Sequence, residues 1–469
     1  MTTEQNALLL PPSPARQRTA ARKTLTTALL AAMVLLVAPG PAISGTEIPP
    51  AGASASIRQF WFSLDTFAEV DAEFDKLGLV FSKPLTAPLP GMSTRAIGTG
   101  PSGFPAPYVI DHVRGRFNVY VERRRPQHPV GALPYFSQEV IFSTPDPRVS
   151  PVGTLTYPST GSNFPAVVLV AGTGAHTRDA GMSLHKTLWV LSDHLTRQGF
   201  AVLRYDKRGI GLTGGALHPG STTDDYLADA LAAARFLTLQ PNIDARNVGI
   251  VGHSEGGIIA AMAAAQAPQD IAFIVMLAGT GMPGIDLKSL QDATERRGNG
   301  MPEPLVRLNE SQERGLLEIA AGKLEHDQAI SAMVSATDAL PADVKRRLEV
   351  PAEGMPVHAY EDLLAPWFRR FLQIDPRTYL AQVKSPVLAL VGEKDVQVPP
   401  TENLEGISTA LASNGNPKTR VLQIAGMNHN LQAARTGKPN EYLLIEETVS
   451  PSVLAVISTW LRDVVGVRN

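Results

Sequence analysis

The chain has 469 residues, of which 44% are hydrophobic and 18% charged, and its formal net charge is -2 at pH 7. A chain of this length holds roughly two to four structural units and can bury a large core, which excludes a disordered or fibrous protein. It contains no cysteine, so disulfide scaffolds, thiolate metal sites and cysteine nucleophiles are excluded. Because basic residues are not in surplus, the composition gives no indication of a nucleic-acid partner.

Residues 1–44 have the pattern of a secretory signal peptide. Four basic side chains come first, at Arg16, Arg18, Arg22 and Lys23. The apolar run Leu25–Ala38 follows, and small residues up to Ser44 suit cleavage. The run is shorter than the about 20 residues that a membrane-spanning helix needs, although a retained N-terminal anchor is the alternative. The sequence therefore predicts export to a bacterial periplasm or medium, with no stable membrane span after cleavage.

Residues 45–134 predict a small accessory region rich in β-strands. The alternating stretch Phe117–Val121 is typical of a strand, and no residues in this region suggest chemistry. The short basic run Arg123–Pro126 predicts a solvated turn, because so few charges seldom make a binding site.

From about Tyr135 onward, short apolar runs alternate with amphipathic stretches of helical length. The expected strands are Val140–Phe142, Gly153–Tyr157, Ala166–Val170, Ala201–Tyr205, Val248–Val251, Ile271–Leu277, Val387–Val391 and Arg420–Ile424. Leucines at helical spacing predict helices over Ser183–Thr196 and Thr223–Leu237. Runs that are apolar throughout favour strands buried on both faces, so the pattern predicts a doubly wound α/β fold with a mainly parallel sheet.

The stretch from Leu277 to Val387 is far longer than one crossover helix needs. We therefore expect a helical cap over residues 281–375, inserted between two parts of the core at 135–280 and 376–469. Within the cap, Glu313–Leu324 and Pro341–Leu348 have helical patterns that are charged on one side.

The clearest chemical signal is the G-x-S-x-G motif of Gly252–Gly256. It stands directly after an expected strand and directly before the alanine-rich stretch Ile258–Ala265, which is the context of a nucleophile on a sharp turn between strand and helix. Glycines are needed at both flanks because side chains there would collide with the neighbouring strand and helix. The motif predicts that Ser254 is a nucleophile at a helix N-terminus, where developing negative charge is favoured.

A serine nucleophile needs a base, and the base needs a carboxylate that orients it. In this architecture the chain order is serine, acid, histidine. Asp395 follows the expected strand Val387–Val391, and His429 is the one histidine beyond it. The sequence predicts the triad Ser254, Asp395 and His429, with Glu393 as the competing acid.

The oxyanion of the tetrahedral intermediate needs backbone N–H donors. We expect one from Glu255, whose side chain, like that of His253, is predicted to be structural. The second donor is expected from the glycine-rich loop after Ala166–Val170, at Thr173 or, as the alternative, Gly174. This loop lacks the signatures of nucleotide binding, and no metal-ligand spacing occurs in the sequence. We therefore predict a protein without a cofactor or catalytic metal.

Several segments together resemble a known family. These are Ala171–Gly174 with Arg178 and Asp179, Arg204–Gly209, Gly252–Gly257, Pro366–Arg369, and Gly392–Asp395 followed by Val398–Pro400. From about Tyr135 to its end the chain resembles the α/β-hydrolase superfamily, and within it secreted bacterial serine esterases of the EstD type, which are related to prolyl-oligopeptidase-like and acyl-thioester hydrolases. The chain departs from the family at Thr173, where the family often has serine, and at Ala175-His176, where it often has Pro-Gln.

The resemblance implies a carboxylesterase that acts on short to medium acyl esters, with Ser254, Asp395 and His429 as its triad. A serine peptidase or aminopeptidase, an acyl-thioesterase, and a catalytically silent binding protein are the alternatives. Arg178, Asp179, Asp206 and Arg208 are expected to stabilise loops around the site, with contact to the substrate as the alternative. An acyl pocket is expected to be lined by Trp367, Phe368 and Phe371, although these rings could equally anchor the cap to the core. The expected partner is a small-molecule ester, and the sequence does not indicate an oligomeric state.

Overall fold

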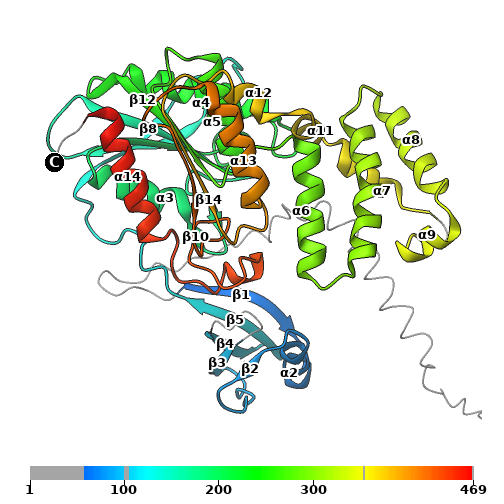
Figure 1. Cartoon of the computed structure of the whole chain (residues 1–469). Helices are drawn as coiled ribbons and strands as arrows, with labels where there is room; N and C mark the ends of the chain where they lie inside the picture. Colours follow the sequence, from blue (N-terminus) through cyan, green and yellow to red (C-terminus); the bar gives the residue numbers. More distant parts are fainter. Residues whose placement is uncertain (1–56, 100–104, 352–353, 467–469) are drawn as a thin grey trace, which may run out of the picture.

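The computed structural model describes residues 57–99, 105–351 and 354–466. The predicted signal peptide, residues 1–44, lies outside the described residues. The described chain comprises a large α/β unit, a small N-terminal sheet beside it and a group of helices at one side (Figure 1).

The α/β unit is built on an eight-stranded sheet with the order β15-β14-β13-β12-β8-β11-β7-β6. Its strands are β6 (Tyr135–Ile141), β7 (Val152–Pro158), β8 (Phe164–Val170), β11 (Ala201–Tyr205), β12 (Ile243–His253), β13 (Ile274–Leu277), β14 (Val387–Gly392) and β15 (Arg420–Ile424). The strands β8 and β11 to β15 pair in parallel, and β6 and β7 continue the sheet antiparallel. This confirms the predicted mainly parallel sheet, and the strand order is that of the α/β-hydrolase fold.

Helices cover both faces of this sheet because its central strands are apolar on both sides. On one face, Val167 and Leu169 pack in the same cluster as Leu191 and Ile457. That face is covered by α3 (Thr187–Arg197) and α14 (Pro451–Val465). The other face carries α4 (Thr223–Thr238), α5 (Glu255–Gln266) and α13 (Pro400–Ala410), whose buried residues cluster with Val168 and Val170. Successive residues of β8 therefore point to opposite faces of the sheet and belong to two separate hydrophobic cores.

The remaining short elements lie in the connections of this unit. They are β9 (Gly181–Met182), β10 (His185–Lys186), α12 (Pro376–Leu380) and the 3₁₀ turns η2 (Leu411–Ser413) and η3 (Pro439–Glu441). None of the helices in the described residues is long and apolar enough to cross a membrane.

The N-terminal region is an antiparallel sheet with one helix packed on it, which agrees with the predicted β-rich accessory region. Its elements are β1 (Ile57–Leu64), α2 (Phe67–Lys76), β2 (Val80–Phe81), β3 (Ser93–Thr99), β4 (Pro105–Val113) and β5 (Arg116–Arg123), in the sheet order β1-β5-β4-β3-β2. Val70 and Phe74 of α2 are buried in one cluster with Tyr108, Ile110 and Val119 of the sheet. The helix begins at a capping box between Thr66 and Glu69.

The predicted solvated turn at Arg123–Pro126 is wrong for Arg125. Its side chain is buried and donates hydrogen bonds to the carbonyl oxygens of Ser183, Leu443 and Ile445, at 2.8, 3.1 and 3.0 Å. A guanidinium can be buried at such a place because three carbonyl acceptors replace the water that it loses. Through these hydrogen bonds, Arg125 links the N-terminal region to the α/β unit.

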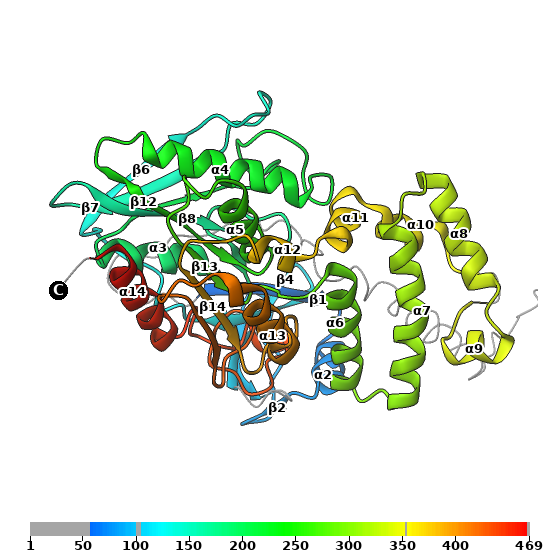
Figure 2. The ribbon, with the colours of Figure 1, turned by 45° about the horizontal axis from the view of Figure 1, so that its top comes forward.

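The predicted cap is present as a group of helices that extends beyond the sheet (Figure 2). It consists of α6 (Gly284–Gly298), α7 (Glu303–Ala321), α8 (His326–Asp338), α9 (Ala342–Arg347), α10 (Val357–Glu361), the 3₁₀ turn η1 (Asp362–Leu364) and α11 (Pro366–Gln373). The helix α7 begins well before the predicted Glu313–Leu324. The last of these helices, α11, contacts α4 of the α/β unit and both α6 and α7 of the cap.

Candidate active site

Ser254 stands on a sharp turn between β12 and α5. Its φ of 55° lies in the left-handed region, which costs free energy for any residue other than glycine. A Cβ atom at Gly252 would lie 1.9 Å from the carbonyl oxygen of Gly256, and one at Gly256 would lie 2.3 Å from that of Val170. The glycines of the motif are therefore required by sterics, as the sequence predicts.

Backbone hydrogen bonds hold this turn in place. The N–H of Ser254 donates to the carbonyl oxygen of Leu277 at 2.8 Å, and the N–H of Gly257 donates to that of Ser254 at 2.8 Å. The first bond fixes the serine to the neighbouring strand β13. The strained backbone is thus stabilised by its surroundings, and Ser254 is kept partly exposed at the carboxyl end of β12.

Asp395 and His429 are in direct contact. Oδ2 of Asp395 lies 2.8 Å from Nδ1 of His429. Oδ1 of the same carboxylate accepts the backbone N–H groups of Gln397 and Val398, at 2.9 and 2.8 Å. The carboxylate is therefore satisfied on both oxygens and fixed in orientation, and it holds the imidazole of His429 through Nδ1.

The loop that carries His429 is held by a buried asparagine. Oδ1 of Asn428 accepts the N–H groups of Asn430 and Gln432, each at 3.0 Å. Glu393, the competing acid of the sequence analysis, lies elsewhere, since its Oε2 accepts the N–H of Gly426 at 2.8 Å. The structure therefore brings Asp395 to the imidazole, while Glu393 stabilises the turn that leads to it.

His253 joins the serine turn to the histidine loop. Its Nε2 donates to the carbonyl oxygen of His429 at 2.9 Å, and the centroids of the two imidazole rings are 4.9 Å apart. Burial lowers the pKa of His253 to about 3, so this side chain is neutral at working pH. The adjacent residue Ser254 is consequently placed close to the segment of His429.

The glycine-rich loop after β8 approaches the nucleophile closely. A Cβ atom at Gly172 would lie 3.0 Å from the Cβ of Ser254. The next carbonyl, that of Thr173, accepts from Nε2 of His176 at 2.8 Å. The predicted oxyanion donors, the N–H groups of Thr173 and Glu255, thus belong to two segments that meet at Ser254. The N–H of Glu255 is in the first turn of α5, where no intrahelical acceptor exists.

The side chain of Glu255 is buried. Its Oε1 accepts from the hydroxyl of Thr223 at 2.8 Å and from Nε1 of Trp367 at 2.7 Å. The Lys207 ammonium lies 3.5 Å from Oε2 of the same carboxylate and donates to the carbonyl oxygen of Gly172 at 2.8 Å. Lys207 is a site residue that the sequence pattern does not predict, although the lysine lies within the family-like segment Arg204–Gly209.

The three aromatic residues predicted to line an acyl pocket pack against one another. The rings of Trp367 and Phe371 are stacked at 5.3 Å, and Phe368 joins them in the main core cluster. All three are buried, and Trp367 is hydrogen bonded to Glu255. These contacts favour the alternative prediction, in which the rings anchor the cap to the core.

The four charged residues that were expected to stabilise loops around the site all form ion pairs. Arg178 pairs with Asp206 at 2.7 Å, and Arg204 contacts Asp179. Arg208 pairs with Asp229 at 2.7 Å. Burial raises the pKa of Asp229 to about 6. Asp229 was not found from the sequence because it lies in the interior of a helix without any local signal.

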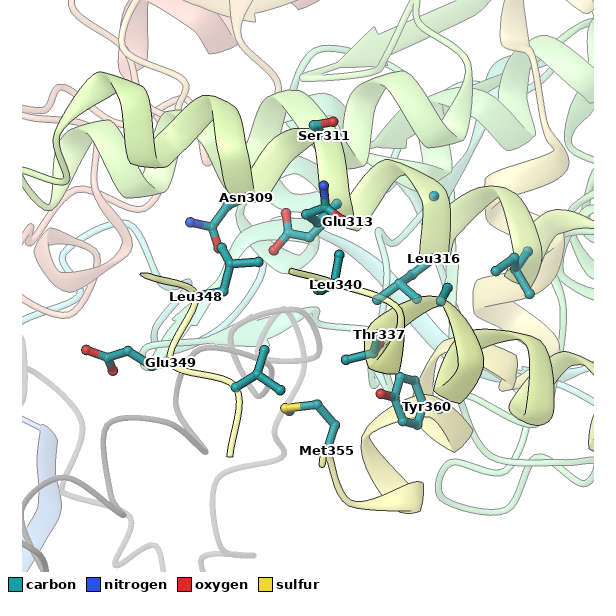
Figure 3. Close-up of a pocket in the computed structure, with 15 residues that line it drawn as sticks. Asn309, Ser311, Glu313, Leu316, Thr337, Leu340, Leu348, Glu349, Met355 and Tyr360 are labelled. Atoms are coloured by element: carbon teal, nitrogen blue, oxygen red, sulfur yellow. The ribbon is translucent and has the colours of Figure 1, made fainter. Parts of the chain in front are cut away.

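A cavity of about 180 Å³ lies inside the cap, between α7, α8 and the segment after α9 (Figure 3). Its lining is mostly apolar and includes Leu316, Leu340 and Tyr360. Glu313 forms part of its polar lining, and burial raises the pKa of this carboxyl to about 7. None of the predicted catalytic or acyl-pocket residues lines this cavity. Within the described residues, no cluster of histidine and carboxylate side chains could hold a metal ion.

The fold and this geometry define a candidate serine-hydrolase site on an α/β-hydrolase fold. A family model described as "Serine aminopeptidase, S33" matches residues 165–334. The chain is 25% identical to the esterase EstD of Thermotoga maritima over 335 residues, which is 70% of each protein. The resemblance to esterases of the α/β-hydrolase superfamily that the motifs indicated is thereby confirmed.

Two solved structures illustrate the structural similarity. The hypothetical protein PA2218 from Pseudomonas aeruginosa matches 72% of this chain and 96% of its own, with a TM-score of 0.45 and 17% identity. Est1E from Butyrivibrio proteoclasticus matches 70% of this chain and 99% of its own, with a TM-score of 0.40 and 16% identity. The α/β-hydrolase fold is shown by the strand order of the eight-stranded sheet.

Proposed function

We propose that this protein is a serine hydrolase that cleaves short to medium carboxylic esters through an acyl-enzyme intermediate. The single observation that carries the proposal is the contact of Asp395 with His429 beside the strained turn of Ser254. These are the three residue types that activate a hydroxyl nucleophile, and they stand in the chain order of this fold. The similarity to the esterase EstD supports an ester as substrate.

In the proposed reaction, Oγ of Ser254 attacks the ester carbonyl and passes its proton to Nε2 of His429. The carbonyl oxygen becomes an oxyanion that the N–H groups of Thr173 and Glu255 stabilise. The imidazolium then protonates the leaving alcohol as the carbon–oxygen bond breaks, which leaves an acyl group on Ser254. Water, deprotonated by His429, attacks this acyl group, and the imidazolium returns the proton to Oγ of Ser254 as the acyl–oxygen bond breaks and the carboxylic acid is released. Asp395 fixes the tautomer and stabilises the imidazolium throughout.

A serine aminopeptidase is the second candidate function, because the matching family model carries that description. The same triad and oxyanion donors would serve an amide or a thioester, so the reaction type depends on what the site binds. Peptide hydrolysis at a free N-terminus additionally requires an acceptor for the substrate ammonium.

The experiment that separates these candidates compares two substrate series on the purified protein. One series consists of p-nitrophenyl esters from acetyl to decanoyl, and the other consists of aminoacyl p-nitroanilides. The proposal expects kcat/KM to be higher by several orders of magnitude on the esters, with the maximum at a short or medium chain. A higher kcat/KM on the anilides would make the protein a peptidase. The variant Ser254→Ala is the control for non-enzymatic hydrolysis.

We also propose that the protein is exported, on the basis of the charged and apolar pattern of residues 1–44. Expression of the full chain in a bacterial host, followed by fractionation and N-terminal sequencing, tests this. A mature N-terminus close to Ser44 in the periplasm or medium is expected. Intact chain in the cytoplasmic fraction would contradict the proposal.

A further inference from the structure

The ammonium group of Lys207 connects the two segments that carry the proposed oxyanion donors. It donates to the carbonyl oxygen of Gly172, directly before Thr173, and it pairs with the carboxylate of Glu255. It also lies 3.8 Å from the centroid of the Tyr226 ring. The lysine is almost completely buried, and burial lowers its pKa while the charge of Glu255 acts in the opposite direction.

The carboxylate of Glu255 extends this connection to the cap. Trp367 is in α11, at the junction of the cap with the α/β unit, and its indole N–H donates to Oε1 of Glu255. The backbone N–H of Trp367 donates to the carbonyl oxygen of Pro219 at 3.0 Å. A continuous set of polar contacts therefore runs from the cap, through Glu255 and Lys207, to the Gly172 carbonyl.

Stability alone is a weak explanation for this network. Desolvating an ammonium and a carboxylate costs free energy, and apolar residues of similar volume often stabilise a protein as well as a buried ion pair does. Oxyanion stabilisation, in contrast, depends on donors placed about 2.7–3.1 Å from the developing charge. A small displacement of Thr173 relative to Glu255 would weaken the stabilisation of the transition state without removing any group that binds the substrate.

We infer that Lys207 is a positioning residue that holds the Gly172–Thr173 loop and Glu255 at the separation that oxyanion binding requires. Through its hydrogen bond to Glu255, Trp367 makes this separation depend on how the cap packs against the α/β unit. This inference rests on the proposed esterase function. Lys207 does not touch the substrate in this account, and its effect is confined to the transition state.

The test uses the variant Lys207→Met. If this variant fails to fold because the carboxylate of Glu255 is left unpaired, the double variant Lys207→Met with Glu255→Gln replaces it, since it removes both charges. We measure kcat and KM on p-nitrophenyl acetate, and Ki for a methyl trifluoromethyl ketone, whose adduct with Ser254 places an oxyanion among the donors. We expect kcat to fall about 10- to 100-fold, which is less than the about 10²- to 10³-fold loss on removing one oxyanion donor, because here the donor is displaced and not removed. KM should stay within about two-fold, and Ki should rise by the same factor as kcat falls.

Trp367→Phe removes the hydrogen bond to Glu255 and keeps an aromatic ring. It should lower kcat by a smaller factor, again with unchanged KM. The matched control is Arg296→Met with Glu313→Gln, which removes another buried ion pair, within the cap between α6 and α7. This control should change only the melting temperature, which it should lower, and kcat and Ki should keep their wild-type values.

Wild-type kcat and Ki in the folded double variant would overturn the inference, and so would a rise of KM with kcat unchanged. If the double variant does not fold while the cap control does, a structural role is shown and the inference is rejected. Failure of the proposed function is a separate result, because the wild-type protein would then not hydrolyse p-nitrophenyl acetate. In the positioning account, the Lys207 variants still become labelled by a fluorophosphonate on Ser254.

Discussion

The carboxylate of Asp395 lies 2.8 Å from Nδ1 of His429, and its second oxygen is occupied by two backbone N–H groups. These contacts fix the orientation of the carboxylate. Because Oδ2 accepts from Nδ1 of His429, the carboxylate determines that Nδ1 carries the proton of the neutral imidazole. Glu393 is nearer to the end of β14 in sequence but is bonded to the backbone of Gly426. The two carboxylates therefore have different roles, which substitution can separate.

Asp395→Asn should reduce kcat by about 10⁴-fold, because the asparagine amide favours the wrong tautomer of His429. Glu393→Gln should stay within about ten-fold of the wild type, since a glutamine oxygen can still accept the N–H of Gly426. Steady-state rates on p-nitrophenyl acetate measure both. The reverse ranking would make Glu393 the orienting acid.

Gly252→Ala should abolish activity and lower the melting temperature, because its Cβ would lie 1.9 Å from a backbone oxygen that cannot move away. Gly315→Ala in α7 is the matched control, since nothing lies within 4 Å of its ideal Cβ. Alanine there should raise the free energy of unfolding by about 0.5–1 kcal/mol and leave activity unchanged. Wild-type activity in the Gly252 variant would contradict the described turn.

Acid should destabilise the protein between about pH 6.5 and 4. Burial lowers the pKa to about 3 for His185 and His253 and to about 4 for His128, His176 and His218. Above pH 6.5 these histidines are neutral in both the folded and the unfolded chain, so their protonation does not reduce the free energy of unfolding. As the pH falls, the unfolded chain binds protons that the folded chain does not, which costs up to about 1.4 kcal/mol per pH unit for each histidine.

The raised pKa values of Asp229 and Glu313, about 6 and about 7, act in the opposite direction and offset part of this loss. Urea unfolding at pH 7.5 and pH 5.0 measures the balance, and a lower midpoint is expected at pH 5.0. His185→Gln should make the pH dependence less steep. Equal midpoints at the two pH values would contradict the neutral burial of these histidines.

Trp367→Ala should lower kcat/KM by a similar factor for acetyl and octanoyl esters and should also lower the melting temperature. The reason is that the ring is buried against Phe371 and bonded to Glu255, and truncating a buried tryptophan costs about 3–5 kcal/mol. Kinetics on both esters and a thermal melt test this. A loss confined to octanoyl esters, without a change in melting temperature, would place Trp367 in the acyl pocket.

The parts of the site that sequence could predict are those that local patterns determine. Apolar runs predicted the strands, steric demands predicted the glycines around Ser254, and chain order left His429 as the single candidate for the base. The contacts of side chains across long distances in sequence were not predictable. Arg125 lies 320 positions from one of its carbonyl acceptors, and Trp367 lies 112 positions from Glu255. Nothing in the pattern around either residue indicates such a partner.

The central claim is that Ser254 is the activated nucleophile of an esterase, and covalent labelling tests it most directly. A fluorophosphonate should modify the wild-type protein once, and peptide mass spectrometry should locate the modification on Ser254. Esterase activity should decline in proportion to labelling, and Ser254→Ala should remain unlabelled. Full labelling of Ser254→Ala, or full activity in the completely labelled protein, would contradict the account.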